Sequence, residues 1–389
     1  MSTAVLPAPL PAPAPLTAAT VRGWQARRAE VDRRLGPCFR RPEARRRAAA
    51  YLDGLLSDTR RKNGWQLAET AGHATPYGFQ HLLGRAVWSA DAARDELYAY
   101  VAEHLGDPEG VVVIDETGFP KQGTRSAGVA RQYCGALGKV ANCQVGVCLA
   151  YVGARGHTLL DRELYLPAAW TDDPARLRAA GLAPDTPFAT KPQLARRMLA
   201  RVLDAGLPVA WVTGDTVYGR ATELRRWLEH AGQHHVLAVP RNESLWVGPA
   251  LWTPEAVHAV QAGQEWYRLS AGAGSKGERR YDWQCWVLAE PENAAWGRYL
   301  LFRRSLADPG RLAGLRGLRA AGLRPGDARG RGRSLSLPEI RRLLWHLVLQ
   351  GPRGVRRLLA WPHWRRRHPW LAQCCHYRRQ CLKPYQVQL

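Results

Sequence analysis

The sequence predicts an α/β protein whose core is a mixed β-sheet with flanking helices, preceded by an all-helical domain and interrupted by a β-rich insert. Three observations support this fold class. Apolar residues recur at three- and four-residue spacing between Thr17 and Leu105, which is typical of helices. The short apolar runs 111–115 and 209–215 are typical of buried strands. An amphipathic helix pattern lies between the two runs, so strands and helices alternate along the chain.

The N-terminal region is predicted to hold a disordered leader and a helical domain. Residues 1–16 alternate Pro, Ala and Leu, which is typical of a disordered segment. Residues 17–107 are predicted to form a helical domain that binds DNA, because 65–86 has a helix, turn, helix pattern and follows the basic run 60–62. Packing of three helices without DNA contact explains the same pattern equally well.

Residues 108–240 are predicted to form the catalytic core. The expected strands lie at 111–115, 143–152, 159–166, 209–215 and 235–240, with a turn at 153–156. A helix is expected from Thr190, whose capping box includes Gln193, to Gly206, and a second helix at 221–231. Three strands followed by helix, strand, helix and strand is the ribonuclease-H-like order, in which the first and fourth strands are neighbours. This order predicts that Asp115 and Asp215 lie close together.

The remainder divides into three predicted segments. Residues 241–306 alternate aromatic and polar residues, which predicts an antiparallel β-insert with a turn at 272–277. Residues 307–334 are a Gly/Arg-rich junction without a clear amphipathic period. Residues 335–389 are predicted to hold a helix at 337–349 and a basic, aromatic tail.

The charge of the chain is informative about partners. Fifty-six Lys and Arg against 33 Asp and Glu give a net charge of +23, which favours a polyanionic partner, DNA or RNA, although a coding bias toward Arg contributes. No apolar run approaches the roughly 18 residues of a membrane helix, and no secretory signal is evident. A cytoplasmic, nucleoid-associated protein with reduced thiols is expected. The cluster 374–381 contains Cys and His, but its spacing disfavours a zinc site.

Asp115 and Asp215 are the candidate catalytic and metal-binding residues. Aspartates at neighbouring strand ends provide the oxygen ligands that Mg²⁺ or Mn²⁺ prefers. Two such ions can activate the attacking hydroxyl and stabilise the leaving oxygen in phosphodiester chemistry. Each aspartate alone is also explained as a turn former or helix N-cap. The joint pattern favours the metal site.

An ordered series of motifs resembles insertion-sequence transposases of the DDE superfamily. The matching stretches are 115–123, 126–133, 142–146, 161–167, 170–173, 188–192, 211–219, 281–283 and 375–379. The resemblance implies a ribonuclease-H-like endonuclease domain, metal-dependent cleavage of element ends and strand transfer by the freed 3′ hydroxyl. It assigns the two metal-binding aspartates to Asp115 and Asp215. Lys121, Arg125 and Arg131 are cations in the first-aspartate region and candidate phosphate contacts, with plain surface charge as the alternative. The implied partner is double-stranded DNA, bound by a homodimer that assembles on it.

The third acidic residue of the family, a glutamate on a helix after the insert, is not found. Asp327 and Glu339 are the acidic residues after Asp308, and Glu339 is explained by the capping box of 336–339. We therefore expect that the segment with the glutamate is deleted, that 311–333 is junction sequence, and that catalysis is impaired. The alternative is a non-catalytic DNA-binding remnant that competes for element ends. A general RNA-binding protein is a weaker alternative, since no RNA module accompanies the tail aromatics.

Overall fold

The computed structural model describes residues 18–247, 250–260, 266–274, 277–287, 296–306 and 312–320. These residues form two compact units that divide between Glu96 and Leu97. The predicted leader, residues 321–334 of the junction and the whole segment 335–389, including Glu339 and the C-terminal cysteines, lie outside the described residues. None of the described helices is long and apolar enough to cross a membrane.

The first unit is helical, as the sequence predicts. Its elements are α1 Ala18–Leu35, the 3₁₀ helix η1 Gly36–Cys38, α2 Pro42–Leu56, α3 Gly64–Thr70 and α4 Tyr77–Gly84. Asn63 is the N-cap of helix α3, and its side-chain oxygen accepts hydrogen bonds from the backbone N–H groups of Trp65 and Gln66. Leu67 of α3 and Phe79 of α4 pack together in a buried cluster, which fixes the helix, turn, helix pair. The next helix, α5 Ala90–Leu105, crosses the division between the units, whereas the predicted boundary was after residue 107.

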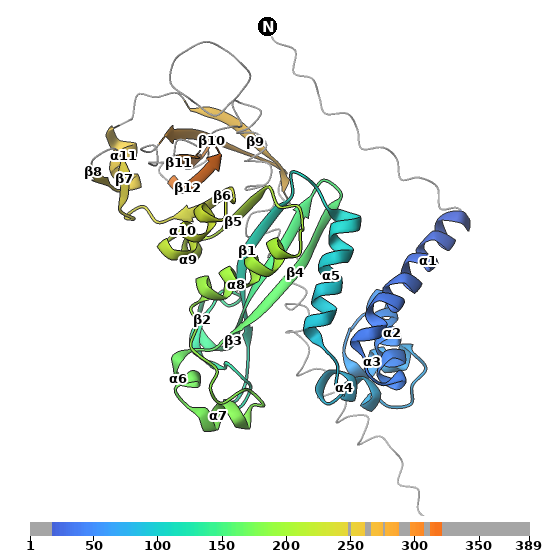
Figure 1. The fold of residues 1–389 in the computed structure, drawn as a ribbon. Coiled ribbons are helices and arrows are strands. Elements are labelled where there is room, and N and C mark those ends of the chain that lie inside the picture. Colours follow the sequence, from blue (N-terminus) through green and yellow to red (C-terminus); the bar gives the residue numbers. More distant parts are fainter. Residues whose placement is uncertain are drawn as a thin grey trace, which may run out of the picture. The chain divides into compact units, whose positions relative to one another are not determined.

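The second unit is built on a large mixed sheet, accompanied by a small two-stranded sheet (Figure 1). Its strand order among the described residues is β2-β3-β1-β5-β6-β12-β11-β10-β9, and β4 pairs with β3. The bounds of the core elements are β1 Val111–Pro120, β2 Ala130–Cys134, β3 Lys139–Gly153, β4 Gly156–Tyr165, α6 Ala168–Thr171, α7 Pro174–Ala179, α8 Lys191–Asp204, β5 Trp211–Gly214, α9 Thr216–Gly219, α10 Thr222–His230 and β6 His235–Val239. Strand β1 pairs antiparallel with β3 and parallel with β5, which confirms that the predicted first and fourth strands are neighbours.

The core elements follow from local sequence. The β-branched run at the start of β1 is fully buried: Val112 and Ile114 belong to one apolar cluster, and Val111 and Val113 belong to another. Helix α8 begins with the predicted capping box of Thr190 and Gln193 and ends before Gly206, whose φ of 71° is the left-handed conformation that glycine adopts readily. The apolar face of α8 packs with Val112 and Ile114 in the largest buried cluster, to which Tyr98 of α5 also belongs.

Two features of the core differ from the sequence prediction. Strand β1 does not end at Asp115 but continues to Pro120, because β3 pairs with it along its whole length. Strand β2 was not predicted, since Ala130–Cys134 lacks a long apolar run, yet it pairs with the start of β3.

Most of the β-rich insert continues the core sheet, whereas its first two strands pair with each other in a separate two-stranded sheet. Its elements are β7 Leu245–Val247, β8 Ala250–Trp252, α11 Pro254–Val260, β9 Tyr267–Gly274, β10 Gly277–Val287, β11 Trp296–Ser305 and β12 Leu312–Ala320. Strands β9, β10 and β11 lie within the predicted insert 241–306, although β9 and β10 extend into the predicted turn at 272–277. Strand β12 falls within the predicted junction 307–334, so this part of the Gly/Arg-rich run is regular structure and pairs with both β11 and β6.

Candidate functional site: an acidic cluster at the end of β5

Three carboxylates meet where β5 ends beside β1. One oxygen each of Asp115, Glu116 and Asp215 lies within 4.8 Å of the other two, and all three residues are half-buried. The parallel register pairs Ile114 with Gly214, and the residue that follows each of them along the chain is an aspartate. The sequence-predicted pair is therefore brought together, and Glu116 joins it.

Asp215 is fixed by the short helix that follows it. Its Oδ1 accepts the backbone N–H of Val217 at 2.9 Å, so Asp215 is the N-cap of α9. The predicted alternatives of N-cap and site residue are compatible, since capping uses one carboxylate oxygen. Helix α9 lies directly on β6: a Cβ at Gly219 would be 1.8 Å from the carbonyl oxygen of Ala238, so only glycine fits there.

Glu116 is held by two side chains from distant parts of the sequence. Its Oε1 accepts a hydrogen bond from Lys191 Nζ at 2.6 Å, and its Oε2 accepts one from the Tyr218 hydroxyl at 2.8 Å. Lys191 is in the first turn of α8, and Tyr218 is a fully buried residue of α9. These contacts connect β1, α8 and α9 through a single carboxylate. We call Glu116, Lys191 and Tyr218 the Glu116 clamp.

The electrostatics of the cluster are unfavourable for three negative charges. Burial first, and then the charge of Glu116, raise the pKa of Asp215 above its usual value, while Lys191 opposes this shift. Burial, followed by the charge of Glu116, also raises the pKa of Tyr218, so its hydroxyl keeps its proton and remains a donor. A cation bound among these oxygens would relieve the repulsion between the carboxylates.

Glu116 was missed by sequence reasoning, which considered only strand-ending aspartates. Its signal was its place next to Asp115, but neighbouring residues on a strand point to opposite faces of a sheet, so adjacency argued against a shared site. Lys191 lies in the motif 188–192 and Tyr218 in the motif 211–219, but neither residue was predicted to belong to the site. The structure supplies the reason for Glu116: β5 ends at Gly214, level with Ile114, so beyond this point that edge of β1 has no strand beside it.

The other sequence-predicted site residues lie away from the cluster. Lys121 follows β1, Arg125 is in the next loop, and Arg131 is on β2; all three are exposed. Lys121 is six positions further along the extended chain than Asp115, which corresponds to roughly 20 Å. The structure therefore does not bring these cations into the acidic cluster.

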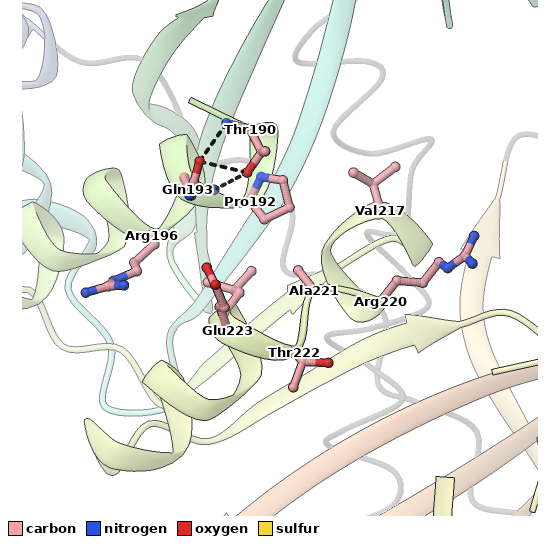
Figure 2. A pocket seen from close by; sticks show the side chains of 10 residues that line it. Thr190, Pro192, Gln193, Arg196, Val217, Arg220, Ala221, Thr222 and Glu223 are labelled. Atoms are coloured by element: carbon pink, nitrogen blue, oxygen red, sulfur yellow. Dashed lines mark hydrogen bonds between the residues drawn. The ribbon is translucent and has the colours of Figure 1, made fainter. Parts of the chain in front are cut away.

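A pocket of about 380 Å³ is formed by the residues next to the Glu116 clamp (Figure 2). Thr190, Pro192 and Arg196 of the α8 start line one side, and Val217 and Arg220 of the α9 region line the other. Figure 2 shows the long side chains of Arg196 and Arg220 extending from its two sides. The pocket thus combines two cations with the first turn of the helix that follows Asp215.

Comparison with known proteins agrees with this geometry. A family model described as DDE superfamily endonuclease matches residues 34–302, a range that contains all three carboxylates. The chain is 26% identical over 283 residues to a probable transposase for insertion sequence element IS701 from Microchaete diplosiphon. That alignment covers 70% of this chain and 71% of the relative.

Proposed function

The chain belongs to the DDE superfamily of endonucleases, and on this basis we propose that it is an insertion-sequence transposase. It cuts DNA at the ends of its element and joins the freed 3′ hydroxyl to target DNA. The observation that carries the proposal is the meeting of Asp115 and Asp215 at neighbouring strand positions inside the matched region. The similarity to a probable insertion-sequence transposase supports it.

Asp115 and Asp215 are the residues that would hold a divalent metal. The superfamily implies the use of such an ion, and the cluster fits it, because its potential ligands are all carboxylate oxygens and are half-buried. Mg²⁺ and Mn²⁺ prefer this donor set over nitrogen or sulfur. When bound, the metal supplies charge stabilisation for the attacking and leaving oxygens of the phosphodiester.

Glu116 acts in this proposal as a positioning residue. Both of its oxygens are used by Lys191 and Tyr218, so it connects the strand of Asp115 to the helix that Asp215 caps. Lys191 also leaves Glu116 less available than a free carboxylate as the third metal ligand. We therefore propose that cleavage is weak, in line with the expected loss of the third acidic residue of the family.

Double-stranded DNA is the proposed substrate, and a homodimer assembled on it is the proposed active form. The net charge of +23 supports a polyanionic partner. Lys121, Arg125 and Arg131 are exposed and are proposed to contact phosphates that flank the cleavage site. A nucleoid-associated location in the cytoplasm follows from such a substrate.

Nicking of supercoiled DNA that carries the element's ends tests this function. The purified chain is incubated with Mg²⁺, with Mn²⁺ or with a chelator, beside Asp115→Ala and Asp215→Ala. The exposed Asp185→Ala is the matched control, because Asp185 is on the loop before α8 and outside the cluster. We expect metal-dependent nicking in the wild type and in the control, and none in the two site variants.

The second candidate function is a non-catalytic remnant that binds and protects element ends. The observation that favours it is the engagement of Glu116 by Lys191, which leaves two carboxylates for metal. Binding of element ends without nicking under any metal condition would support the remnant and overturn the transposase proposal. Nicking that persists in Asp115→Ala would overturn both the assignment of the site and its metal.

A further inference from the structure

The first unit contains a basic groove, and none of the described residues that line it belongs to the acidic cluster. It has a volume of about 810 Å³ and is lined by residues from the η1–α2 connection, from α2, and from the end of α4. Among the described residues that line it, those with ionisable side chains are Arg40, Arg41, Glu43, Arg47, His81 and Arg85. Four arginines and one acidic residue therefore face the same space.

The arginines of this groove differ from those that stabilise the unit. Arg28 binds Asp53 at 2.7 Å, Arg34 binds Glu30 at 2.8 Å, and Arg94 binds Asp91 at 2.7 Å. Within the described part of the chain, by contrast, no carboxylate pairs with Arg40, Arg41, Arg47 or Arg85. Glu43, the one acid among the described residues that line the groove, has its Oε1 3.7 Å from Nη2 of Arg46, which is not among the lining residues.

The groove is built on a fixed scaffold rather than on mobile side chains alone. Phe39 and Trp88 form an antiparallel β-bridge, and their rings lie 5.4 Å apart. Trp88 Nε1 donates to the carbonyl oxygen of Leu82 at 3.0 Å, and the backbone N–H of Ser89 donates to that of Cys38 at 3.1 Å. These contacts tie the segment that carries Arg40 and Arg41 to the segment that carries Arg85. The cations are therefore held near one another before any ligand binds.

In the basic run 60–62 before α3, Lys62 contacts the end of a helix and does not line the groove. Lys62 Nζ donates to the carbonyl oxygen of Gly54 at 2.9 Å and also to that of Ser57. A cation at the C-terminal carbonyls of a helix satisfies groups that would otherwise lack partners, so Lys62 stabilises the end of α2. In the sequence, the basic run that accompanies the helix, turn, helix pattern is 60–62. In the structure, the groove is a different basic surface of the same unit.

We propose that this groove binds the phosphate backbone of double-stranded DNA. The proposal rests on the proposed function, because it assigns the surface by which the transposase holds its DNA. Closely placed arginines without carboxylate partners repel one another, and a polyanion removes that repulsion. Among the residues that the structure describes, no Trp, Tyr or Phe lines the groove, so stacking of unpaired bases is disfavoured and a duplex is favoured over a single strand. Arg85 directly follows α4, the second helix of the helix, turn, helix pair.

The salt dependence of DNA binding tests this groove. Fluorescence anisotropy with the full chain measures the Kd for a labelled duplex with the element's end and for one of random sequence, without divalent metal. Arg40→Gln/Arg85→Gln is compared with Arg22→Gln/Arg27→Gln, which removes the same charge from exposed positions on α1. We expect the groove variant to weaken binding of both duplexes by about tenfold per arginine and to reduce the slope of log Kd against log salt by about 1 per arginine. The control variant should retain the wild-type slope.

A charge-preserving variant and a folding control distinguish loss of charge from loss of structure. Arg40→Lys/Arg85→Lys retains the charge and should restore the slope, and circular-dichroism melting verifies that each variant is folded. Equal slopes for the groove and control variants, or binding of a single strand as tight as that of the duplex, would overturn the groove proposal. The two proposals can fail separately. If the wild type shows no metal-dependent nicking but the groove variant still binds DNA more weakly, the transposase proposal fails. If the wild type nicks DNA and the groove variant binds DNA as tightly as the wild type, only the groove proposal fails.

Discussion

Asp215 carries a charge that the folded protein disfavours, because burial and then Glu116 raise its pKa. A carboxyl whose pKa is higher in the folded than in the unfolded chain binds its proton more tightly when folded. The free energy of unfolding therefore decreases as pH rises from the usual value of 3.8 through the raised pKa, and the loss is complete above it.

Asp215→Asn should consequently raise the Tm at neutral pH in the presence of a chelator, since asparagine can still cap α9. Adding Mn²⁺ should raise the Tm of the wild type and leave the variant unchanged. Differential scanning calorimetry with and without metal measures both effects, with the exposed Asp185→Asn as control. A variant less stable than the wild type in chelator would contradict this account of the cluster.

Tyr218 stabilises the same site through its hydroxyl. Tyr218→Phe keeps the buried ring but removes the donor to Glu116 Oε2, so the free energy of unfolding should fall by about 1 to 3 kcal/mol. Tyr218→Phe/Glu116→Gln should be less destabilised than the sum of the single variants, because the two residues contact each other. Urea unfolding of the four proteins measures this coupling. Additive effects would show that the Glu116 clamp does not act as a unit.

At the scale of elements, one buried carboxylate connects α5, β4 and α8. The side chain of Asp161 on β4 is fully buried, and its Oδ2 accepts hydrogen bonds from Tyr98 at 2.6 Å and from Arg201 at 2.8 Å. Arg201 also binds Glu163 at 2.7 Å. Burial and then the bond to Asp161 raise the pKa of Tyr98, so this hydroxyl remains a donor at all physiological pH values.

Arg201→Met should destabilise the chain by about 3 to 5 kcal/mol, because it removes the closer cation from the buried charge of Asp161 and leaves it with Arg162 at 3.6 Å. The exposed Arg197→Met on the same helix is the control and should cost little. Adding Asp161→Asn to Arg201→Met should recover part of the loss, as measured by urea unfolding. An Arg201→Met protein as stable as the control would show that the network contributes no net stability.

At the scale of the whole second unit, β12 joins the insert to the core sheet. It pairs with β6 from Gly314 to Leu318 and with β11 along its whole length. Without β12, β6 and β11 would each present an open edge, which favours aggregation. The strand lies in the Gly/Arg-rich run that the sequence suggested to be a deletion junction; the deletion itself stays a prediction.

Arg316→Pro tests this role of β12, since proline cannot donate a backbone hydrogen bond in the middle of a sheet. Position 316 pairs with Leu237 of β6 and with Leu300 of β11. We expect a lower Tm and concentration-dependent aggregation in light scattering. Arg316→Gln removes the same charge, keeps the N–H and should remain close to wild type. Equal behaviour of the two variants would show that this pairing does not stabilise the unit.

Much of the fold and half of the site were predictable from local patterns. Apolar runs predicted β1 and β5, the capping box predicted α8, and the order of elements predicted that Asp115 and Asp215 are neighbours. Strands β2 and β12 were not predicted, because their sequences carry no distinctive apolar alternation and their pairing partners determine their structure.

The sequence by itself determined the order of helices and strands and the two aspartates, because hydrophobic periodicity and strand-end position are local properties. Only the tertiary structure decided that Glu116 completes the cluster and that Lys191 and Tyr218 hold it, since these partners lie 75 and 102 residues away along the chain. The same is true of the arginine groove, whose cations come from two segments joined by the Phe39 and Trp88 bridge. Contacts between distant segments depend on where strands end and how they pair, and local patterns do not encode those distances.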